Sequence, residues 1–169
     1  NLRKMLPVLA ERWSTVLNAG GFAVINFGDI VSAEKIAGSD GPCEYPMALE
    51  YWPVFRAAGY VLWSRRIWCK PVARTGSMQC ISSNRAATNW EHMWTWKRPG
   101  KPVVDAQISG EWTSQLGWRD TSSAAPPEVD AETHGASMPV APAEWMIAIH
   151  SRIGGIVYEP FSGTGTTIV

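Results

Sequence analysis

The chain has 169 residues, of which 46% are hydrophobic, and its basic and acidic side chains are equal in number. No apolar run is long enough to cross a membrane and no signal peptide is recognisable, so we expect a soluble cytoplasmic domain with one hydrophobic core. Cys43, Cys69 and Cys80 match no zinc-binding spacing and cannot all pair. Reduced thiols and the absence of a metal site are therefore expected.

A helix followed by a strand is predicted at the N-terminus. Apolar residues recur there at helical spacing, namely Leu2, Met5, Leu6, Leu9, Trp13, Val16 and Leu17. The turn Asn18-Ala19-Gly20-Gly21 ends the helix, with glycine where a left-handed cap is required. Residues 22–27 are then predicted to form a short strand.

The net charge of zero hides a basic middle segment. Residues 51–101 have nine basic side chains and one acidic side chain, a net charge of +8, whereas residues 1–50 have −2 and residues 102–169 have −6. Six of the ten tryptophans lie in the same basic segment. Basic and aromatic side chains together favour contact with a nucleic-acid backbone and stacking on bases. For any single arginine, the alternative remains open that it only solvates the outer face of a hairpin whose tryptophans point inward.

Two strands are predicted in this basic segment, over residues 60–70 and 91–97. Gly59 precedes the first, Pro99-Gly100 ends the second, and a polar connection spans residues 71–89. The side chains that we expect to contact nucleic acid are Arg74, Asn84, Arg85, Lys97 and Arg98.

Residues 102–133 are predicted to be mostly loop, and their Ser-, Pro- and Glu-rich portion has the composition of an acidic surface linker. A helix follows, with Pro142 in its first turn, Glu144 near its N-terminal end and Arg152 at a basic C-terminal end.

The most specific signal lies at the C-terminal end. The apolar run over residues 153–157 predicts a buried parallel strand, and it is followed by Tyr158-Glu159-Pro160-Phe161-Ser162-Gly163-Thr164-Gly165-Thr166-Thr167. A strand that ends at a Gly-x-Gly turn before a helix is a usual position for a nucleotide-like ligand, because glycine lets the backbone approach it closely. The acidic side chain can accept hydrogen bonds from ribose hydroxyls. A glycine-rich turn without a ligand is the alternative, but it does not explain the Pro-Phe pair or the paired threonines.

This string resembles the S-adenosylmethionine loop of the methyltransferases that modify exocyclic amino groups of DNA bases. Their string is usually Asp-Pro-Phe-x-Gly-Ser-Gly-Thr-Thr, so Glu159 and Thr164 depart mildly from it. The segment from His134 to Met138-Pro139 is similar to the family's His-Pro-x-x-Lys/Phe-Pro segment, which closes over the methionine end of the cofactor. The resemblance implies S-adenosylmethionine as the cofactor, held by His134, Ala136, Met138, Pro139, Glu159, Pro160, Phe161, Ser162, Gly163, Gly165, Thr166 and Thr167.

The resemblance also implies an α/β, Rossmann-like fold, incomplete in this chain, with an antiparallel strand pair at the sheet edge. The cofactor loop comes last, as in the beta subclass, in which the catalytic half precedes the cofactor half. We therefore expect residues 1–169 to be one methyltransferase-domain fragment. Within it, residues 1–101 would be the end of the catalytic half, 102–133 a loop or target-recognition region, and 134–169 the cofactor segment.

The catalytic tetrapeptide of the family, Asp/Ser-Pro-Pro-Tyr/Trp, is not in this chain. We expect it upstream of Asn1, so no catalytic residue is assigned and the isolated chain is expected to be inactive and marginally folded.

The implied function is site-specific methyl transfer to the amino nitrogen of adenine (N6) or cytosine (N4) in double-stranded DNA, after the base is flipped out of the duplex. Neither a metal nor a covalent enzyme intermediate is implied. Two alternatives stay open, a non-catalytic nucleic-acid-binding remnant of the fold and an RNA methyltransferase. A homodimer and a restriction-system partner also stay open.

Overall fold

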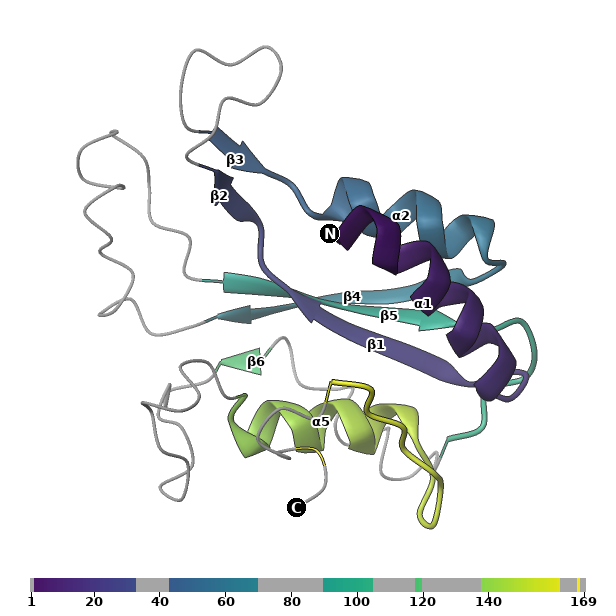
Figure 1. The fold of residues 1–169 in the computed structure, drawn as a ribbon. Coiled ribbons are helices and arrows are strands. Elements are labelled where there is room, and N and C mark those ends of the chain that lie inside the picture. Colours follow the sequence, from purple (N-terminus) through teal and green to yellow (C-terminus); the bar gives the residue numbers. More distant parts are fainter. Residues whose placement is uncertain are drawn as a thin grey trace. The chain divides into compact units, whose positions relative to one another are not determined.

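A computed structural model describes residues 2–32, 43–69, 90–104, 118–119, 138–161 and 167 (Figure 1). In chain order its elements are α1 (Leu2–Val16), β1 (Phe22–Phe27), β2 (Ile30–Ser32), β3 (Cys43–Tyr45), α2 (Ala48–Ala57), β4 (Val61–Cys69), β5 (Trp90–Lys97), β6 (Trp118–Arg119) and α5 (Val140–His150). The chain divides into two compact units, one made of Asn1–Arg66 and Glu91–Pro102 and the other of Ile67–Trp90 and Val103–Val169. None of the described helices is long and apolar enough to span a bilayer.

The predicted helix and strand at the N-terminus are confirmed, and a glycine turn joins them. Gly20 adopts a left-handed φ of 79°, and a Cβ built on it would lie 1.9 Å from the carbonyl oxygen of Lys101. Its N–H donates to the carbonyls of Arg98 and Pro99, both at 3.2 Å. Only glycine tolerates this combination of conformation and close approach, so the turn ties the end of α1 to the end of β5.

The four-stranded sheet has the order β1-β5-β4-β6. β1 and β5 are antiparallel, with a register that runs from Phe22 opposite Lys97 to Phe27 opposite His92. Figure 1 draws β4 and β5 running in opposite directions, so the predicted antiparallel pair is present. Among the described residues, only the two-residue β6 lies beyond β4. It is parallel to β4 and places Trp68 opposite Trp118.

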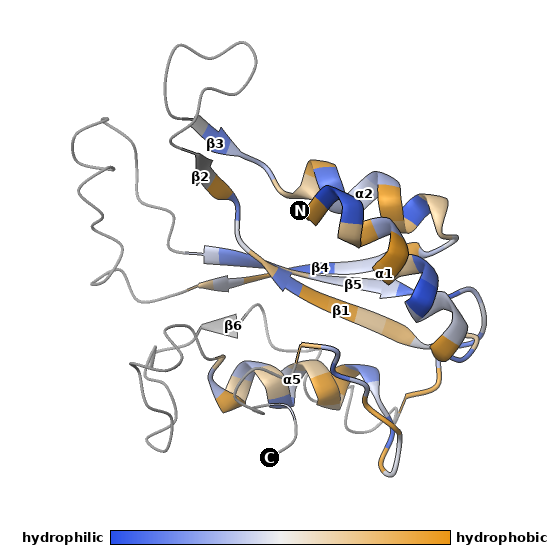
Figure 2. Cartoon of the chain, in the orientation of Figure 1, coloured by the Kyte–Doolittle hydropathy of each residue, from blue (hydrophilic) through white to orange (hydrophobic). Residues whose placement is uncertain are grey.

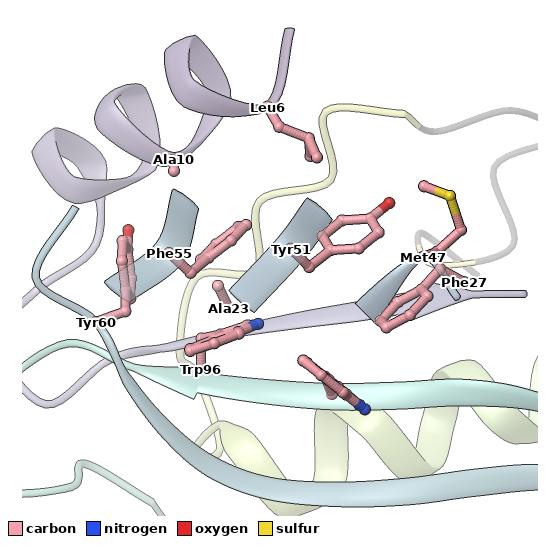
Figure 3. Close-up of a cluster of buried hydrophobic side chains, with 10 residues drawn as sticks. Leu6, Ala10, Ala23, Phe27, Met47, Tyr51, Phe55, Tyr60 and Trp96 are labelled. Carbon is pink, nitrogen blue, oxygen red and sulfur yellow. The ribbon is translucent and has the colours of Figure 1, made fainter. Parts of the chain in front are cut away.

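The core of the first unit lies between the two N-terminal helices and one face of the sheet (Figure 3). α1 supplies Leu6 and Ala10, and α2 supplies Tyr51 and Phe55. The ring of Phe55 stacks on Trp96 of β5, with centroids 5.1 Å apart. The other buried members are Ala23, Phe27, Met47, Tyr60 and Trp94.

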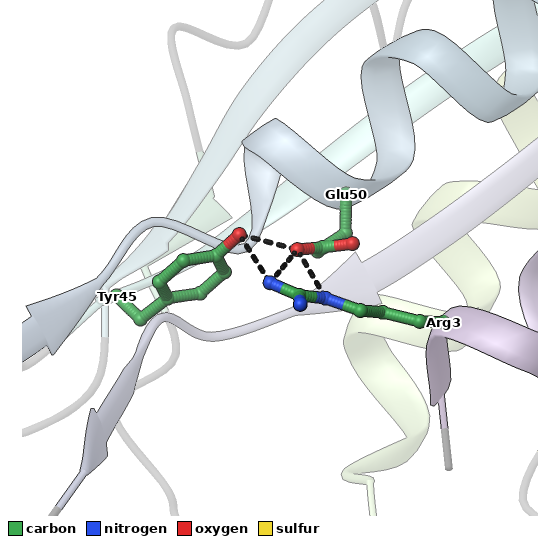
Figure 4. Close-up of polar contacts among 3 residues, drawn as sticks. All are labelled: Arg3, Tyr45 and Glu50. Carbon is green, nitrogen blue, oxygen red and sulfur yellow. Dashed lines mark hydrogen bonds and ion pairs between the residues drawn. The ribbon is translucent and has the colours of Figure 1, made fainter. Parts of the chain in front are cut away.

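Helix α2 and the β2–β3 hairpin were not predicted. Asp29, which follows β1, accepts the backbone N–H of Met47 through Oδ1 at 2.8 Å, and this satisfies a donor at the start of α2. Arg3 of α1 also reaches α2, where its guanidinium lies 2.8 Å from Glu50 (Figure 4). Hydrogen bonds from Tyr45 and then from Arg3 lower the pKa of Glu50. These contacts hold the unpredicted segment against α1.

The prediction of a buried parallel strand over residues 153–157 is wrong. Gly154 has a φ of 71° and the N–H of Gly155 bonds to the carbonyl of Arg152 at 2.9 Å, so the segment begins with a tight turn. Ile156 is 98% exposed and Ile153 is 78% exposed. A parallel strand needs neighbouring strands to pair its backbone and cover its faces, and within the described ranges no strand pairs with this segment. Figure 2 colours the described ribbon by hydropathy, and the exposed large apolar side chains of this segment also include Val157 at 45%.

Candidate cofactor loop and nucleic-acid surface

The predicted cofactor site is described at both of its ends. The described members are Met138, Pro139, Glu159, Pro160, Phe161 and Thr167. The others, His134, Ala136, Ser162, Gly163, Gly165 and Thr166, lie outside the described residues.

Pro139 stands directly before α5 and is buried, with an extended backbone (φ −61°, ψ 153°). Pro142 lies in the first turn of the helix, as predicted, and is also buried. Proline is tolerated there because the first backbone N–H groups of a helix have no acceptor within the helix. α5 ends at His150, two residues before the predicted basic end at Arg152.

Glu159 connects the two ends of the glycine loop. Its Oε1 accepts the backbone N–H of Phe161 at 2.9 Å, and its Oε2 accepts the hydroxyl of Thr167 at 3.2 Å. These bonds bring residues 159 and 167 together. The carboxylate of Glu159 therefore links Phe161 to Thr167, the described residues on either side of the glycine string.

The aromatic side chains next to Glu159 fit a nucleoside cofactor. The Phe161 side chain is 59% exposed and Tyr158 is 63% exposed, so two aromatic rings beside the loop are open to a ligand. Aromatic side chains supply large stacking surfaces to such ligands. The N–H of Phe161 already donates to the Glu159 carboxylate, so this backbone donor is satisfied within the protein.

A second cluster, here called the Trp63 surface, consists of Phe22, Trp63, Arg65 and Lys97 in the first unit. Lys97 Nζ lies 4.5 Å from the centroid of the Trp63 ring and donates to the carbonyl of Gly100 at 2.8 Å. Phe22 lies 6.0 Å from the same ring, which is 51% exposed. Arg65 is exposed two residues further along β4. An exposed tryptophan beside cations suits stacking and phosphate contact.

Five of the six tryptophans of the basic segment separate into two groups, and Trp90 is half-buried. Trp68, Trp94 and Trp96 are buried, which agrees with the alternative of an inward-facing hairpin, whereas Trp52 and Trp63 are each about half exposed. Trp63 was not among the predicted contact residues. Its place on the exposed alternation of β4 is a signal that period-two counting could have found.

The two described members of the predicted nucleic-acid set differ. Lys97 belongs to the Trp63 surface, whereas the guanidinium of Arg98 donates to the carbonyl of Leu17 after α1. That bond satisfies an unpaired helix-end carbonyl and gives Arg98 a structural role. Arg74, Asn84 and Arg85 lie outside the described residues, so their contact with nucleic acid stays a prediction.

A further polar group, at the end of β1, was not predicted. Asn26 donates to Glu91 at 2.5 Å, and His92 Nε2 lies 3.5 Å from Asp29 Oδ2. Across the described ranges, no three His, Cys, Asp or Glu side chains gather in a way that could hold a metal ion. The bond of Asn26 to Glu91 links β1 to β5, and Asp29 links the end of β1 to Met47 at the start of α2.

Comparisons with known proteins agree with these features. The profile of the N6/N4 methyltransferase family, described as DNA methylase, matches residues 2–169. Type II methyltransferase M.BglI of Bacillus subtilis is 31% identical over 115 residues, which are 66% of this chain and 32% of that protein. The chain thus spans about a third of the length of this curated relative.

Solved structures show the same fold. A protein of Thermus thermophilus described as a DNA modification methylase, complexed with S-adenosyl-L-methionine, gives a TM-score of 0.71 at 23% identity over 98% of this chain and 65% of its own. The cytosine-N4-specific PvuII DNA methyltransferase gives 0.67 at 16% identity over 98% of this chain and 60% of its own. The predicted α/β, Rossmann-like methyltransferase fold is confirmed.

Proposed function

Because the chain belongs to the DNA methylase family of N6/N4 methyltransferases, we propose that its protein is an S-adenosylmethionine-dependent DNA methyltransferase. The methyl acceptor is the exocyclic amino nitrogen of adenine (N6) or cytosine (N4) in double-stranded DNA. The observation that carries the proposal is the family's glycine string from Glu159 to Thr167, together with the hydrogen bonds that the Glu159 carboxylate accepts from Phe161 and Thr167.

In this proposal, the residues of the chain bind the cofactor and orient it toward the target base. When bound, S-adenosylmethionine supplies an electrophilic methyl group. Gly163 and Gly165 let the backbone approach the cofactor, Phe161 offers its exposed ring, and His134 with Met138-Pro139 closes over the methionine end. Holding the donor in line with the amino nitrogen turns a bimolecular encounter into a nearly unimolecular step.

The Trp63 surface is the part of the protein that we assign to DNA, together with Arg74, Asn84 and Arg85 of the connection over residues 71–89. Lysine and arginine supply phosphate contacts that do not depend on sequence. An amino group inside a duplex is not accessible to the donor, so the target base must leave the stack.

The test is methyl transfer by the full-length protein from S-adenosylmethionine to unmethylated duplex DNA. Mass spectrometry of the digested nucleosides should show N6-methyladenine or N4-methylcytosine. A product methylated at cytosine C5, or methylated RNA in place of DNA, would contradict the proposal.

Binding of the cofactor is tested separately by Gly163→Val. The branched side chain fills the space that the backbone turn leaves for the ligand, so calorimetry should show no binding of S-adenosylmethionine. The matched control is Gly28→Ala, because a Cβ at Gly28 meets only ordinary van der Waals contact with Glu91 at 3.5 Å. Unchanged affinity in Gly163→Val would rule out this loop as the cofactor site.

A further inference from the structure

We propose that the open face of the Trp63 ring stacks on one unpaired base of the DNA, while Lys97 and Arg65 contact phosphates of the same strand. This inference rests on the proposed function, which assigns the Trp63 surface to DNA, and it adds the form of DNA that the surface takes. It gives Trp63 the role of holding a base without reading which base it is.

The Trp63 surface lies on the side of the sheet that faces away from the core. Side chains alternate between the two faces of a strand, and Leu62 and Trp96, which are next to Trp63 and Lys97 in the sequence, pack against or belong to the core. Trp63 and Lys97 therefore point to the opposite face. Phe22 lies directly opposite Lys97, and β5 lies between β1 and β4, so the three side chains come from adjacent strands.

One face of the Trp63 ring is covered by a cation. Lys97 Nζ lies over the ring, 4.5 Å from its centroid, and donates to the carbonyl of Gly100 at 2.8 Å, which holds the ammonium in place. Trp63 is nevertheless 51% exposed, so its open area lies away from Lys97. A side chain that enters between two base pairs needs both of its faces open. Trp63 can therefore cap a single base but cannot insert into an intact stack.

The Trp63 ring is also held in position before DNA binds. Phe22 packs against it with centroids 6.0 Å apart and a tilt of 58°, and Lys97 lies over it. A side chain that is already ordered loses little conformational entropy when a ligand stacks on it. The ring thus offers a pre-organised stacking surface.

An unpaired base is the part of DNA that fits this surface. In a duplex the faces of each base are covered by the neighbouring base pairs, so a ring on the face of a sheet reaches a base face only where a base has left the stack. The proposed reaction requires such a departure, because the amino group is not accessible inside the duplex. Every base has a π face, so stacking tolerates any base.

The cations of the surface are placed for the backbone of the same strand. A lysine ammonium has three donors, so Lys97 can take a phosphate oxygen in addition to the Gly100 carbonyl. Arg65 is exposed two residues after Trp63 on the same side of β4, which is roughly 6.6 Å along the strand. Charges along one DNA strand are about 3.4 Å apart. A strand whose base covers Trp63 therefore brings neighbouring phosphates near both cations.

The experiment compares two DNA strands that have the same charge. One is a thymine oligonucleotide of about twelve nucleotides, and the other is an abasic strand of the same length. Thymine has no exocyclic amino group, so neither strand offers a methyl acceptor. Fluorescence anisotropy should show that the full-length protein binds the thymine strand at least about fivefold more tightly than the abasic strand.

Two variants of Trp63 isolate the contribution of the ring. Trp63→Leu and Trp63→Phe both keep an apolar side chain at this exposed position, but only Trp63→Phe keeps an aromatic ring. Trp63→Leu should reduce the preference for thymine to less than about twofold, whereas Trp63→Phe should keep a preference of at least about threefold. Arg65→Gln should weaken binding of both strands by the same factor, because a phosphate contact needs no base.

The matched control is Trp52→Leu. Trp52 is 47% exposed in the same unit, but its ring lies against Trp96, with centroids 5.8 Å apart, and belongs to α2. Trp52→Leu should therefore keep the preference of wild type. A wild-type protein without a preference for thymine would overturn the inference, and so would equal preferences in Trp63→Leu and Trp63→Phe.

The methyl-transfer assay on duplex DNA separates this inference from the proposed function. A protein that transfers no methyl group but prefers thymine through Trp63 contradicts the proposed function and supports the stacking role. A protein that methylates DNA without this preference contradicts the stacking role alone.

Discussion

Tyr60, at the start of β4, makes the stability of the first unit sensitive to alkaline pH. Its side chain is 1% exposed, its ring lies 5.4 Å from that of Phe55, and its hydroxyl has no hydrogen-bond partner among the described residues. Burial raises the pKa of Tyr60 from 10.0 to about 12, and the nearby positive charge of Arg98 acts in the opposite direction. Ionisation of the phenol therefore costs more free energy in the folded protein than in the unfolded chain.

The sign and size of the effect follow from these values. A tyrosine whose pKa is raised in the folded state contributes stability that is fully present below the pKa of the unfolded chain, near 10, and is lost as the pH rises toward about 12. The free energy of unfolding should fall by about 1.4 kcal/mol at pH 11 and by about 2.3 kcal/mol at pH 12 on account of Tyr60.

Urea unfolding of wild type, Tyr60→Phe and Tyr158→Phe at pH 7, 10 and 11 measures the effect. At pH 7, Tyr60→Phe should be as stable as wild type or up to about 1 kcal/mol more stable, because it removes a buried hydroxyl without a partner among the described residues. At pH 11, Tyr60→Phe should not show the decrease of about 1.4 kcal/mol in the free energy of unfolding that ionisation of Tyr60 causes in wild type. Tyr158 is 63% exposed, so Tyr158→Phe should follow wild type throughout. The pKa of Tyr51 is also raised by burial, so the difference from wild type, rather than the absolute slope, is the readout.

The reasoning would be refuted by either of two results. The first is a free energy of unfolding of Tyr60→Phe that falls as steeply as that of wild type between pH 10 and 11. The second is a free energy of unfolding that is lower in Tyr60→Phe than in wild type by more than about 1 kcal/mol at pH 7, which would mean that the hydroxyl makes a stabilising hydrogen bond.

Two further predictions concern the core and the nucleic-acid surface. Phe55→Ala should destabilise the protein by about 3–5 kcal/mol in urea unfolding, because Phe55 is fully buried against Trp96 and Tyr60, and a loss below about 1 kcal/mol would contradict this packing. Arg74→Gln and Arg85→Gln should each reduce the steepness of the log–log plot of DNA affinity against salt concentration by about one. The control Lys4→Gln changes an exposed lysine and should leave this slope unchanged. An unchanged slope in the arginine variants would mean that these arginines only solvate the hairpin.

The elements that the sequence predicted well are those whose signals are local. α1, β1, β4 and β5 begin and end within one residue of the predicted limits. Helical spacing of apolar residues, glycine turns and runs of strand-forming residues act over a few residues and do not depend on distant partners. The family string around Gly163 is likewise a local pattern, and the match of residues 2–169 to the DNA methylase family confirms the family that it indicated.

Elements that depend on distant partners were missed or wrongly predicted. Helix α2 contains Pro53, which disfavours a helix locally, and it is held in place by Tyr51 and Phe55 in the core and by Arg3 from α1. The run over residues 153–157 has the composition of a buried strand but no neighbouring strand among the described residues, so it remains exposed.

The candidate site shows the same division. The sequence by itself shows the family's glycine string and the acidic side chain that precedes it. Only the tertiary structure decided that the carboxylate of Glu159 faces the Phe161 amide and the Thr167 hydroxyl, and that Trp63 lies outside while Trp94 and Trp96 lie inside. The physical reason is that a hydrogen bond or a buried contact forms only where the fold brings two groups within reach. The Glu159 partners are near in the sequence, whereas Trp96 is covered by Phe55 of α2, which is distant along the chain.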